Sequence, residues 1–387
     1  MKVINTEKLP IKLWLDDIED GALQQAKNLA NLPFAFKWIS IMPDSHQGFG
    51  MPIGGVLATK DVVVPNAVGV DIGCGMCAVR SSLTEISTEN LKSIMSKIRK
   101  SIPVGFNHHK EKILWSGFCD APIDIPVIKQ ELESAHYQLG TLGGGNHFCE
   151  IQKGSDNFIW IMIHSGSRNF GLKIAKEYHE KAKLLCEKWF SNIPDKDLSF
   201  LPLGTEEADE YLMAMNFALK FAKENRFRMI EAVKTAFIEE MSRAQIVQFD
   251  EIINVHHNYA TFENHYDENV MVHRKGATSA RKGQFGLIPG SQGTKSYVVE
   301  GKGNPESFMS CSHGAGRKMG RKQAQRELDL ETEKKKLDDL GVIHSIRSKD
   351  DLDEAAGAYK DIDVVMKNQS DLVEILVELT PLAVIKA

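Results

Sequence analysis

The sequence predicts an α+β fold in which helices flank an irregular β-sheet core that carries a metal site. Short apolar runs broken by Gly, Pro and Asp fill residues 1–80 and 250–320, which is typical of strands and loops. Between them, the stretch at about 172–245 has apolar residues at a helical period. Length alone suggests two or three domains, although an irregular α+β chain of this size can also share a single core.

The first 80 residues should consist mainly of strands and loops. We expect one helix at about 16–31 and a second at 86–101. The apolar run IWIMIH at 159–164 is short enough to be a buried strand. This strand would place His164 at its end.

Two amphipathic helices are predicted in the second half. The first follows Gly171, and the second covers about 206–244, with Thr205 as its N-cap and two glutamates in its first turn. Strands and glycine-rich loops return at 250–320. A charged helical stretch from Arg321 to about Leu340, then a final helix and strand, complete the prediction.

The composition is that of a globular protein. With 42% hydrophobic residues, and 30 Gly against 13 Pro, the 387-residue chain can bury a large core and has no bias toward disorder. No apolar run approaches the roughly 20 residues that a bilayer span requires, and the N-terminus lacks the apolar region of a secretory signal. We therefore expect a cytoplasmic protein with no membrane partner.

The six cysteines are too sparse in a chain of this length to form a disulfide framework, so we expect reduced thiols. Cys74 and Cys77 form a C-x-x-C, which could be a redox pair or half of a zinc knuckle. No second C-x-x-C and no thioredoxin-like pattern accompanies it. Cys77 is therefore expected to be structural.

One basic segment lies in an otherwise acidic chain. Residues 271–326 contain eleven Lys and Arg against two Glu, a net charge of +9 in a protein of formal net charge −5. A phosphate-rich ligand would explain this asymmetry, and a solvated charged face is the alternative.

Six short segments combine metal-ligand or phosphate-binding residue types with glycine. They are MPDSHQG (42–48), VGVDIGCGM (68–76), GGGNHFCE (143–150), HSGSR (164–168), VHHNYA (255–260) and HGAGR (313–317). A purely structural histidine needs no such neighbours, whereas glycine lets the backbone approach a ligand closely.

These segments contain a candidate metal site. Asp71 and Cys74 lie three residues apart, so both side chains can face one ion from a tight turn. With His147, His164 and His257 they supply five ligands, more than the three or four protein ligands of one catalytic zinc. The simplest interpretation is that two metal ions share the thiolate of Cys74.

Two glycine-rich loops, GGGN at 143–146 and PGSQG at 289–293, resemble phosphate-binding loops, in which successive N–H groups converge on an anion. The basic run at 273–283 would supply positive charge around the same anion. Neither loop fits the Walker pattern or the dinucleotide fingerprint, which disfavours a P-loop ATPase or a Rossmann enzyme.

In this order, the segments resemble the RtcB family of RNA-splicing ligases. The motifs DIGCGM, GGGNHF-x-E, HSGSR, HRKGAT, PGS-x-G and HGAGR cover most of the chain between Asp44 and Lys386. The resemblance implies a single RtcB-like catalytic domain of α+β fold over residues 1–387, with a long helical insertion at about 172–245. It also implies two manganese ions as cofactor and GTP as the energy source. It implies RNA substrates with a 3′-phosphate or 2′,3′-cyclic phosphate end and a 5′-hydroxyl end, in splicing or repair, and it is compatible with an activating helper protein.

The resemblance also implies residue roles. His313 would carry the guanylate, which would then pass to the RNA as an RNA-ppG end. The metal ligands would be Asp71, Cys74, His147, His164 and His257, with Cys74 bridging the two ions. Nucleotide contacts would be Asn146, His147, Phe148, Glu150, His257, Asn258, Pro289, Gly290, Ser291, Gln292, Ser296, Gly314, Ala315, Gly316 and Lys386. Basic residues near GTP or RNA phosphates would be Arg168, Lys275, Arg317 and Arg321.

The chain departs from the family pattern at two positions and in length. Gln292 stands where a methionine is expected in PGS-x-G, and Gly320 stands where a serine is expected before Arg321. The chain is also shorter than many members. No metal ligand and no nucleophile is lost, but the subgroup and its RNA stay open. A thiolate alone would favour zinc or iron, so manganese rests on the resemblance.

Two alternative functions use the same residues. A dinuclear metallo-phosphoesterase would use the same ligands for hydrolysis, but it needs no nucleotide-accepting histidine at His313. An RNA- or ribosome-binding module would use the basic segment, with a metal that only stabilises the fold. That module would still bind RNA after loss of the metals.

Overall fold

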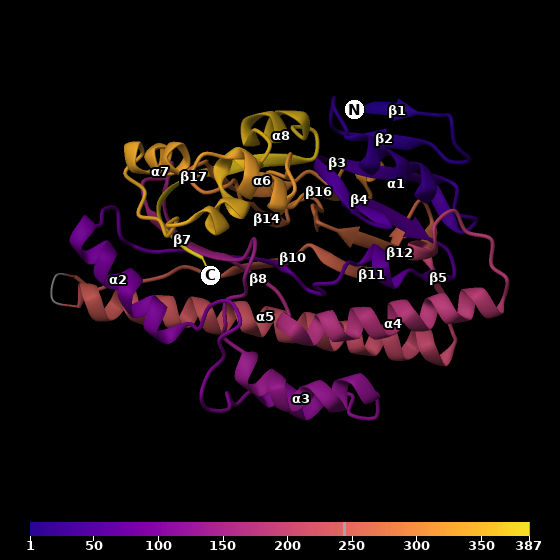
Figure 1. Ribbon diagram of the computed structural model, residues 1–387, viewed down its shortest axis with the longest axis horizontal. Helices are drawn as coiled ribbons and strands as arrows, with labels where there is room; N and C mark the ends of the chain where they lie inside the picture. Colours follow the sequence, from indigo (N-terminus) through magenta and orange to yellow (C-terminus); the bar gives the residue numbers. More distant parts are fainter. Residues whose placement is uncertain (243–244, 387) are drawn as a thin grey trace.

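The computed structural model describes residues 1–242 and 245–386, and it has two large β-sheets beside a layer of long helices (Figure 1). The first sheet has six strands in the order β1-β2-β3-β4-β12-β11. All its pairs are antiparallel except β2 with β3. Its strands are β1 (Lys2–Ile4), β2 (Ile11–Leu13), β3 (Ala35–Phe49), β4 (Met51–Thr59), β11 (Asn258–His265) and β12 (Glu268–Lys275).

The second sheet has seven antiparallel strands in the order β10-β6-β8-β7-β17-β15-β14. Its strands are β6 (Gly75–Arg80), β7 (Phe148–Gly154), β8 (Ile159–Ser165), β10 (Ile253–His256), β14 (Phe285–Ile288), β15 (Ser296–Gly301) and β17 (Val373–Ile385). Two short ladders pair β5 (Val62–Val63) with β9 (Leu201–Pro202) and β13 (Ala277–Ser279) with β16 (Ser310–Ser312).

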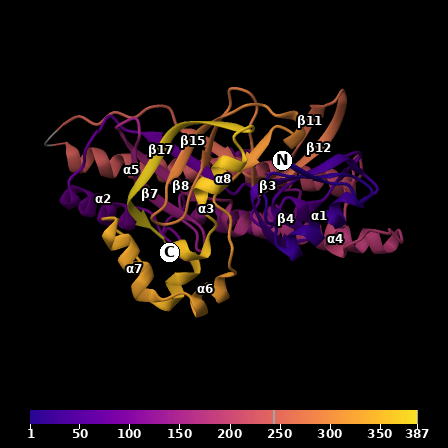
Figure 2. The same ribbon diagram turned by 90° about the horizontal axis from the view of Figure 1, so that it is seen from above.

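Helices cover the sheets on more than one side. The α-helices are α1 (Asp20–Ala30), α2 (Thr88–Ser101), α3 (Pro126–Gln138), α4 (Arg168–Lys188), α5 (Glu206–Met241), α6 (Arg321–Glu327), α7 (Leu330–Asp339) and α8 (Ile362–Asn368). The 3-10 turns are η1 (Pro65–Ala67), η2 (Ser116–Asp120), η3 (Lys196–Leu198), η4 (Pro305–Ser307), η5 (Lys349–Glu354) and η6 (Ala356–Ala358). Seen from above, α6 and α7 project beside the sheets near the C-terminus (Figure 2).

Helix α5 is the longest element and runs along the long axis of the molecule (Figure 1). Its first half packs Tyr211 and Phe221 against α3 and α4 in one hydrophobic core. Its second half packs Ile230 and Phe237 against α2 and the strands β6, β7 and β8 in another. Because burial of each large apolar side chain contributes about 1.5–3 kcal/mol, α5 is a main support of the seven-stranded sheet.

The predicted α+β class is confirmed, as are the helix at 86–101 and the strand that contains His164. The predicted N-cap at Thr205 is also confirmed, because its hydroxyl accepts a hydrogen bond from Ala208 N. Helix α1 begins at Asp20 rather than 16, and α4 already begins at Arg168. The predicted end of α5 at Ala244 lies outside the described residues.

The charged stretch after Arg321 is helical but divided. Leu328 adopts an extended conformation, with φ −81° and ψ 143°, and Asp329 then caps α7 by accepting a hydrogen bond from Thr332 N. Helix α3 was not predicted from the sequence. None of the helices in residues 1–242 and 245–386 is long and apolar enough to cross a membrane.

The register of four neighbouring strands brings distant segments to one edge of the seven-stranded sheet. His164 near the end of β8 lies opposite Met76 of β6 on one side and Phe148 of β7 on the other. Gly75, the first residue of β6, pairs with His256, the last residue of β10. The residues adjoining these strand ends, Cys74, His147 and His257, therefore lie beside His164.

Helix α5 holds the loops at this edge through two buried polar side chains. The Asn225 amide accepts hydrogen bonds from Gly140 N and Thr141 N, at 2.7 and 3.1 Å, and donates to Gly166 O at 3.1 Å. The Arg226 guanidinium donates to Gly73 O and Ser165 O at 2.8 and 2.9 Å. Both side chains are fully buried, so these bonds are shielded from water.

We expect Asn225→Ala to lower the free energy of unfolding by about 1–3 kcal/mol, because it leaves the buried N–H groups of Gly140 and Thr141 without an acceptor. Urea denaturation followed by circular dichroism measures this change. The control Asn192→Ala, at an exposed position, should change it by less than about 0.5 kcal/mol. Equal effects of the two substitutions would contradict the supporting role of Asn225.

Candidate active site

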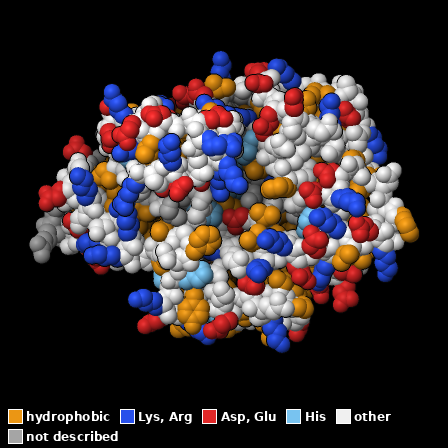
Figure 3. All heavy atoms as spheres, in the orientation of Figure 1, with side chains coloured by type: hydrophobic (Ala, Val, Ile, Leu, Met, Phe, Trp, Pro, Cys, Tyr) orange, Lys and Arg blue, Asp and Glu red, His pale blue; other side chains and the backbone are white. Residues whose placement is uncertain are grey.

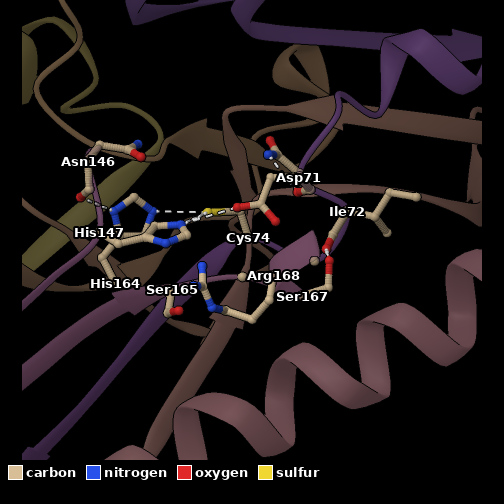
Figure 4. A network of polar contacts seen from close by, with 12 residues as sticks. Asp71, Ile72, Cys74, Asn146, His147, His164, Ser165, Ser167 and Arg168 are labelled. Carbon is tan, nitrogen blue, oxygen red and sulfur yellow. Dashed lines mark hydrogen bonds and ion pairs between the residues drawn. The ribbon is translucent and has the colours of Figure 1, made fainter. Parts of the chain in front are cut away.

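Five potential metal ligands converge at the sheet edge, as Figure 4 shows for four of them. The ligand atoms of Cys74, His164 and His257 lie within 4.8 Å of one another, and so do those of Asp71, Cys74 and His147. The two groups share Cys74. The five residues that the sequence analysis named as candidate ligands therefore lie close together, at or next to the ends of β6, β7, β8 and β10.

The individual distances in this cluster are short. The Cys74 Sγ atom lies 3.4 Å from His147 Nε2 and 3.3 Å from His164 Nε2. His164 Nε2 lies 3.3 Å from His257 Nε2, and His147 Nε2 lies 3.2 Å from Asp71 Oδ2. In Figure 4 the two imidazole rings of His147 and His164 point toward the sulfur atom.

The tautomer of His164 follows from its partner. Its Nδ1 lies 3.0 Å from the carbonyl oxygen of Asn146, and a carbonyl can only accept a hydrogen bond. Nδ1 therefore carries the hydrogen, and Nε2 presents a lone pair to Cys74 and His257. In metal-binding histidines, the ring nitrogen that does not face the metal usually donates a hydrogen bond of this kind, which fixes the orientation of the ring.

The protonation preferences of the cluster fit a bound cation. Burial lowers the pKa of His164 and of His257, so both imidazoles are neutral and can act as ligands. Burial raises the pKa of Asp71, but the hydrogen bond and charge of His147 outweigh it and the pKa lies below its usual value. Burial and Asp71 both raise the pKa of the Cys74 thiol, so a thiolate here requires a neighbouring positive charge.

Several buried polar atoms at this place have no partner among the described residues. They include Asp71 Oδ1, His147 Nδ1 and His257 Nδ1. Such unpaired atoms are costly in a buried environment. The residues therefore fit a divalent metal site, in which one carboxylate, one sulfur and three imidazoles are available.

A second histidine arrangement lies next to the cluster. His313 follows β16, and its ring centroid is 4.7 Å from that of His257. The Nδ1 atom of His313 is 2.6 Å from Asp44 Oδ2, an oxygen that also accepts hydrogen bonds from His313 N and Gly314 N. Because Nδ1 donates to the carboxylate, Nε2 is left with a free lone pair.

A large cavity joins these residues. It has a volume of about 1090 Å³ and is lined by the loops that contain Asp71, Asn146, Pro289 and His313, together with the C-terminal Lys386. Figure 3 shows histidine side chains within the hollow on this face, with Lys and Arg side chains gathered at its upper rim. The cavity is large enough for a nucleotide.

Two buried glutamates lie at the cavity, and their pKa values shift in opposite directions. Burial raises the pKa of Glu150 to about 8, and its side chain accepts a hydrogen bond from Gln152. Burial also raises the pKa of Glu354, but Lys386, Arg317 and Arg321 outweigh burial and hold it below its usual value. Glu354 is therefore ionised.

Most residues that the sequence predicted for this site line the cavity. They are Asp71, Cys74, Asn146, Phe148, Glu150, His164, His257, Asn258, Lys275, Pro289, Gly290, Ser291, Gln292, His313, Gly314, Ala315, Gly316, Arg317, Arg321 and Lys386. Three others, His147, Arg168 and Ser296, are absent from the lining. Ser296 instead accepts a hydrogen bond from Gly290 N at 3.2 Å and so supports the loop at 289–293.

Two of the predicted basic residues are held by backbone carbonyls. The Lys275 ammonium donates to Phe49 O and Asn66 O at 2.6 and 3.0 Å, and burial lowers its pKa to about 7. The Arg168 guanidinium donates to Gly105 O at 2.8 Å and lies beneath the ligand cluster in Figure 4.

Three residues of the site had no role in the sequence analysis: Glu354 and Tyr359 line the cavity, and Asp44 contacts His313. Asp44 lies in MPDSHQG, a segment that was recognised as part of the site, but its partner His313 is 269 residues away in sequence. Glu354 and Tyr359 lie in a charged stretch near the C-terminus without a glycine-histidine pattern. No local signal distinguishes Glu354 from its acidic neighbours, so only the fold identifies it.

Comparison with known proteins gives a consistent result over nearly the whole chain. The family model described as tRNA-splicing ligase RtcB matches residues 25–387. The RNA-splicing ligase RtcB of Escherichia coli K12 is 40% identical over 411 residues, covering 100% of this chain and 99% of that protein. The tRNA-splicing ligase RtcB of Thermococcus kodakarensis is 30% identical, covering 98% of this chain and 95% of that protein. The chain therefore belongs to the RtcB family of RNA-splicing ligases.

Proposed function

We propose that this chain uses GTP to join an RNA 3′-phosphate or 2′,3′-cyclic phosphate end to a 5′-hydroxyl end, with His313 as the guanylate carrier. The observation that carries the proposal is the orientation of His313. Asp44 accepts a hydrogen bond from Nδ1, and Nε2 is free beside both the ligand cluster and the nucleotide-sized cavity. Neither hydrolysis nor simple RNA binding requires a histidine held in this way.

The proposal includes two manganese ions, one held by Asp71, Cys74 and His147 and the other by Cys74, His164 and His257. The convergent ligand atoms support the metal site, and the choice of manganese follows from the family resemblance. When bound, the ions would neutralise the negative charge that develops on phosphate oxygens.

In the first step, His313 Nε2 attacks the α-phosphorus of GTP. A P–N bond forms, the bond between the α-phosphorus and its bridging oxygen breaks, and pyrophosphate leaves. Asp44 keeps the ring in the orientation for attack and stabilises the positive charge that the imidazole acquires. Arg317 and Arg321 line the cavity and would bind the negatively charged phosphates.

In the second step, an oxygen of the RNA 3′-phosphate attacks the guanylate phosphorus, and the P–N electron pair returns to His313. The product is an RNA-ppG end, whose GMP is a good leaving group. In the third step the 5′-hydroxyl oxygen attacks the RNA phosphorus, GMP leaves and the hydroxyl proton is released. A 3′,5′ phosphodiester is formed. A cyclic phosphate end must first be opened by water to a 3′-phosphate.

The nucleotide base would be recognised by two buried groups. Guanine presents two adjacent N–H donors and one carbonyl acceptor on its edge. Burial disfavours the charged form of Glu150 and the charge of Lys386 favours it, so we expect Glu150 to ionise when guanine binds. Its carboxylate then accepts from the two donors, and the Lys386 ammonium donates to the carbonyl. Both residues line the cavity, and the charge of Lys386 acts on Glu150.

An RNA strand could continue along a second hollow of about 520 Å³ in the basic segment. It is lined by Tyr259, Phe262, Arg281 and Lys282, among others. The Phe262 side chain is 58% exposed. Exposed aromatic and basic side chains together are typical of single-stranded nucleic acid binding, because bases stack and phosphates pair with cations.

Replacement of Cys74 by Ser should reduce manganese binding and abolish every step, because it removes the sulfur that both ligand groups share. Metal analysis after dialysis against manganese measures the stoichiometry, and circular dichroism reports the fold. The control is Cys77→Ala. Cys77 lies in β6 and is buried in the hydrophobic core, so this substitution should leave the manganese stoichiometry unchanged. Full ligase activity of Cys74→Ser would refute the dinuclear site.

Replacement of His313 by Ala should eliminate labelling of the protein by α-labelled GTP, because no other group takes the guanylate. The wild-type adduct should be labile in acid, as a phosphoramidate is. Supplied with RNA that already bears a 3′-ppG end, the variant should still seal it to a 5′-hydroxyl. A labelled His313→Ala protein would show that another residue is the carrier.

Replacement of Arg281 and Lys282 by Gln should weaken RNA binding and reduce the salt dependence of the association constant. Each lost phosphate contact should lower the slope of log K against log salt by about 0.7, while guanylylation is unaffected. Filter binding at several salt concentrations measures this slope. The control Lys100→Gln, an exposed residue on α2 outside the basic segment, should leave it unchanged. An unaltered slope in the double variant would argue against RNA contact there.

A further inference from the structure

The carboxylate of Glu354 is a buried junction at the cavity wall. The side chain is 3% exposed, and its residue ends the 3-10 turn η5. Oε1 lies 3.0 Å from Arg317 Nη1 and 3.1 Å from Arg321 Nε. Oε2 lies 3.5 Å from Lys386 Nζ and accepts a hydrogen bond from the Tyr359 hydroxyl. One carboxylate thus contacts three cations, two from the segment at 317–321 and one from near the C-terminus.

The three cations depend on Glu354 to different degrees. Arg317 has further acceptors, Met319 O at 3.0 Å and Asp353 O at 2.6 Å. Arg321 and Lys386 form no other ion pair or hydrogen bond among residues 1–242 and 245–386. Arg321 repels Lys386, and Glu354 attracts Lys386 more strongly than Asp353 does. The Glu354 carboxylate is therefore the main attraction that keeps the two cations at the cavity wall.

We propose that Glu354 is a positioning residue for nucleotide binding, which holds Arg321 and Lys386, together with Arg317, so that their remaining N–H groups face the bound nucleotide. The inference rests on the proposed function and extends it to a residue that does not itself contact the reacting atoms. After one negative charge is offset, a net charge of +2 remains around the bound nucleotide, with the arginines facing its phosphates and Lys386 facing its base.

The position of Gln292 supports this role. Its side-chain amide is buried and donates to the Glu354 carbonyl oxygen at 3.1 Å, so it ties the loop at 289–293 to the segment that contains Glu354. A methionine, the residue expected in this motif, could not donate this hydrogen bond. In this chain, Gln292 therefore helps to fix the place of the carboxylate.

Arg321 also lies between Glu354 and the glycine-rich loop at 143–146. An added side-chain carbon at Gly145 would lie 2.5 Å from Arg321 Nη2, so the guanidinium packs directly over the glycine-rich loop that precedes Asn146 and His147. Arg321 is half exposed, with 52% of its side chain accessible. Its only fixed acceptor in the described part of the chain is Glu354, which therefore determines whether it lies over the cavity or in solvent.

The experiment compares the GTP dependence of protein guanylylation in wild type, Glu354→Gln and a matched control. The control is Glu333→Gln, which removes another buried glutamate of the C-terminal region, one that binds Lys336 and Gly357 N and does not line the cavity. The half-saturating GTP concentration should rise about tenfold or more in Glu354→Gln, since charge-assisted hydrogen bonds that position the cations are lost. The maximal rate of adduct formation should change less than about twofold.

A charge effect without positioning would give the opposite result. Removal of a negative charge from the cavity would then tighten the binding of anionic GTP, so an unchanged or lower half-saturating concentration in Glu354→Gln overturns the proposal. A reduced maximal rate with an unchanged half-saturating concentration also overturns it. If wild type itself takes no label from GTP, the proposed function fails and the positioning role fails with it.

Two further variants keep the test decisive if Glu354→Gln does not fold. Glu354→Asp retains the charge on a shorter side chain and should raise the half-saturating concentration less than Gln does. Gln292→Met leaves the carboxylate in place but removes its tether, and should raise it by a few-fold. Wild-type GTP dependence in both folded variants overturns the proposal.

Discussion

The antiparallel pairing of β10, β6, β8 and β7 is the constraint on which the site depends. It places His164 between β6 and β7, and it aligns the strand ends that adjoin Cys74, His147 and His257. A shift of one residue in any of these ladders would turn a ligand to the other face of the sheet. Gly73 and Gly140 lie in turns outside the strands, and Asn225 and Arg226 of α5 hold them at this edge through buried hydrogen bonds.

The sequence predicted the fold class and the group of candidate ligands, but not the arrangement of the strands. Asp71, Cys74 and the three histidines were recognisable because metal-ligand residue types occur next to glycines, which is a local signal. The strand order was not predictable, since it depends on pairings between segments that are far apart in the chain. Helix α3 was not predicted. The division of the charged stretch into α6 and α7 was not predicted either, because it depends on the extended conformation of one residue, Leu328.

Residues that act through a partner were the hardest to recognise. Asp44 lies in β3 of the six-stranded sheet, and Glu354 lies in a 3-10 turn near the C-terminus. The sequence around these two residues gives no sign of their partners, because the partners are distant in sequence. Asp44 contacts His313, and Glu354 contacts Arg317. Physical reasoning from sequence therefore identifies groups with a chemistry of their own more readily than groups that orient them.

The site lies where the two sheets meet, and this division has a consequence for catalysis. Cys74, His147 and His164, three of the candidate metal ligands, lie at strand ends of the seven-stranded sheet, whereas Asp44, which contacts His313, belongs to β3 of the six-stranded sheet. The relative position of the two sheets therefore sets the distance from the His313 ring to the ligand cluster, 4.7 Å between the centroids of His313 and His257. Since a misplacement of about 1 Å can greatly slow a reaction, core packing between the sheets contributes to the chemistry as directly as the residues that line the cavity.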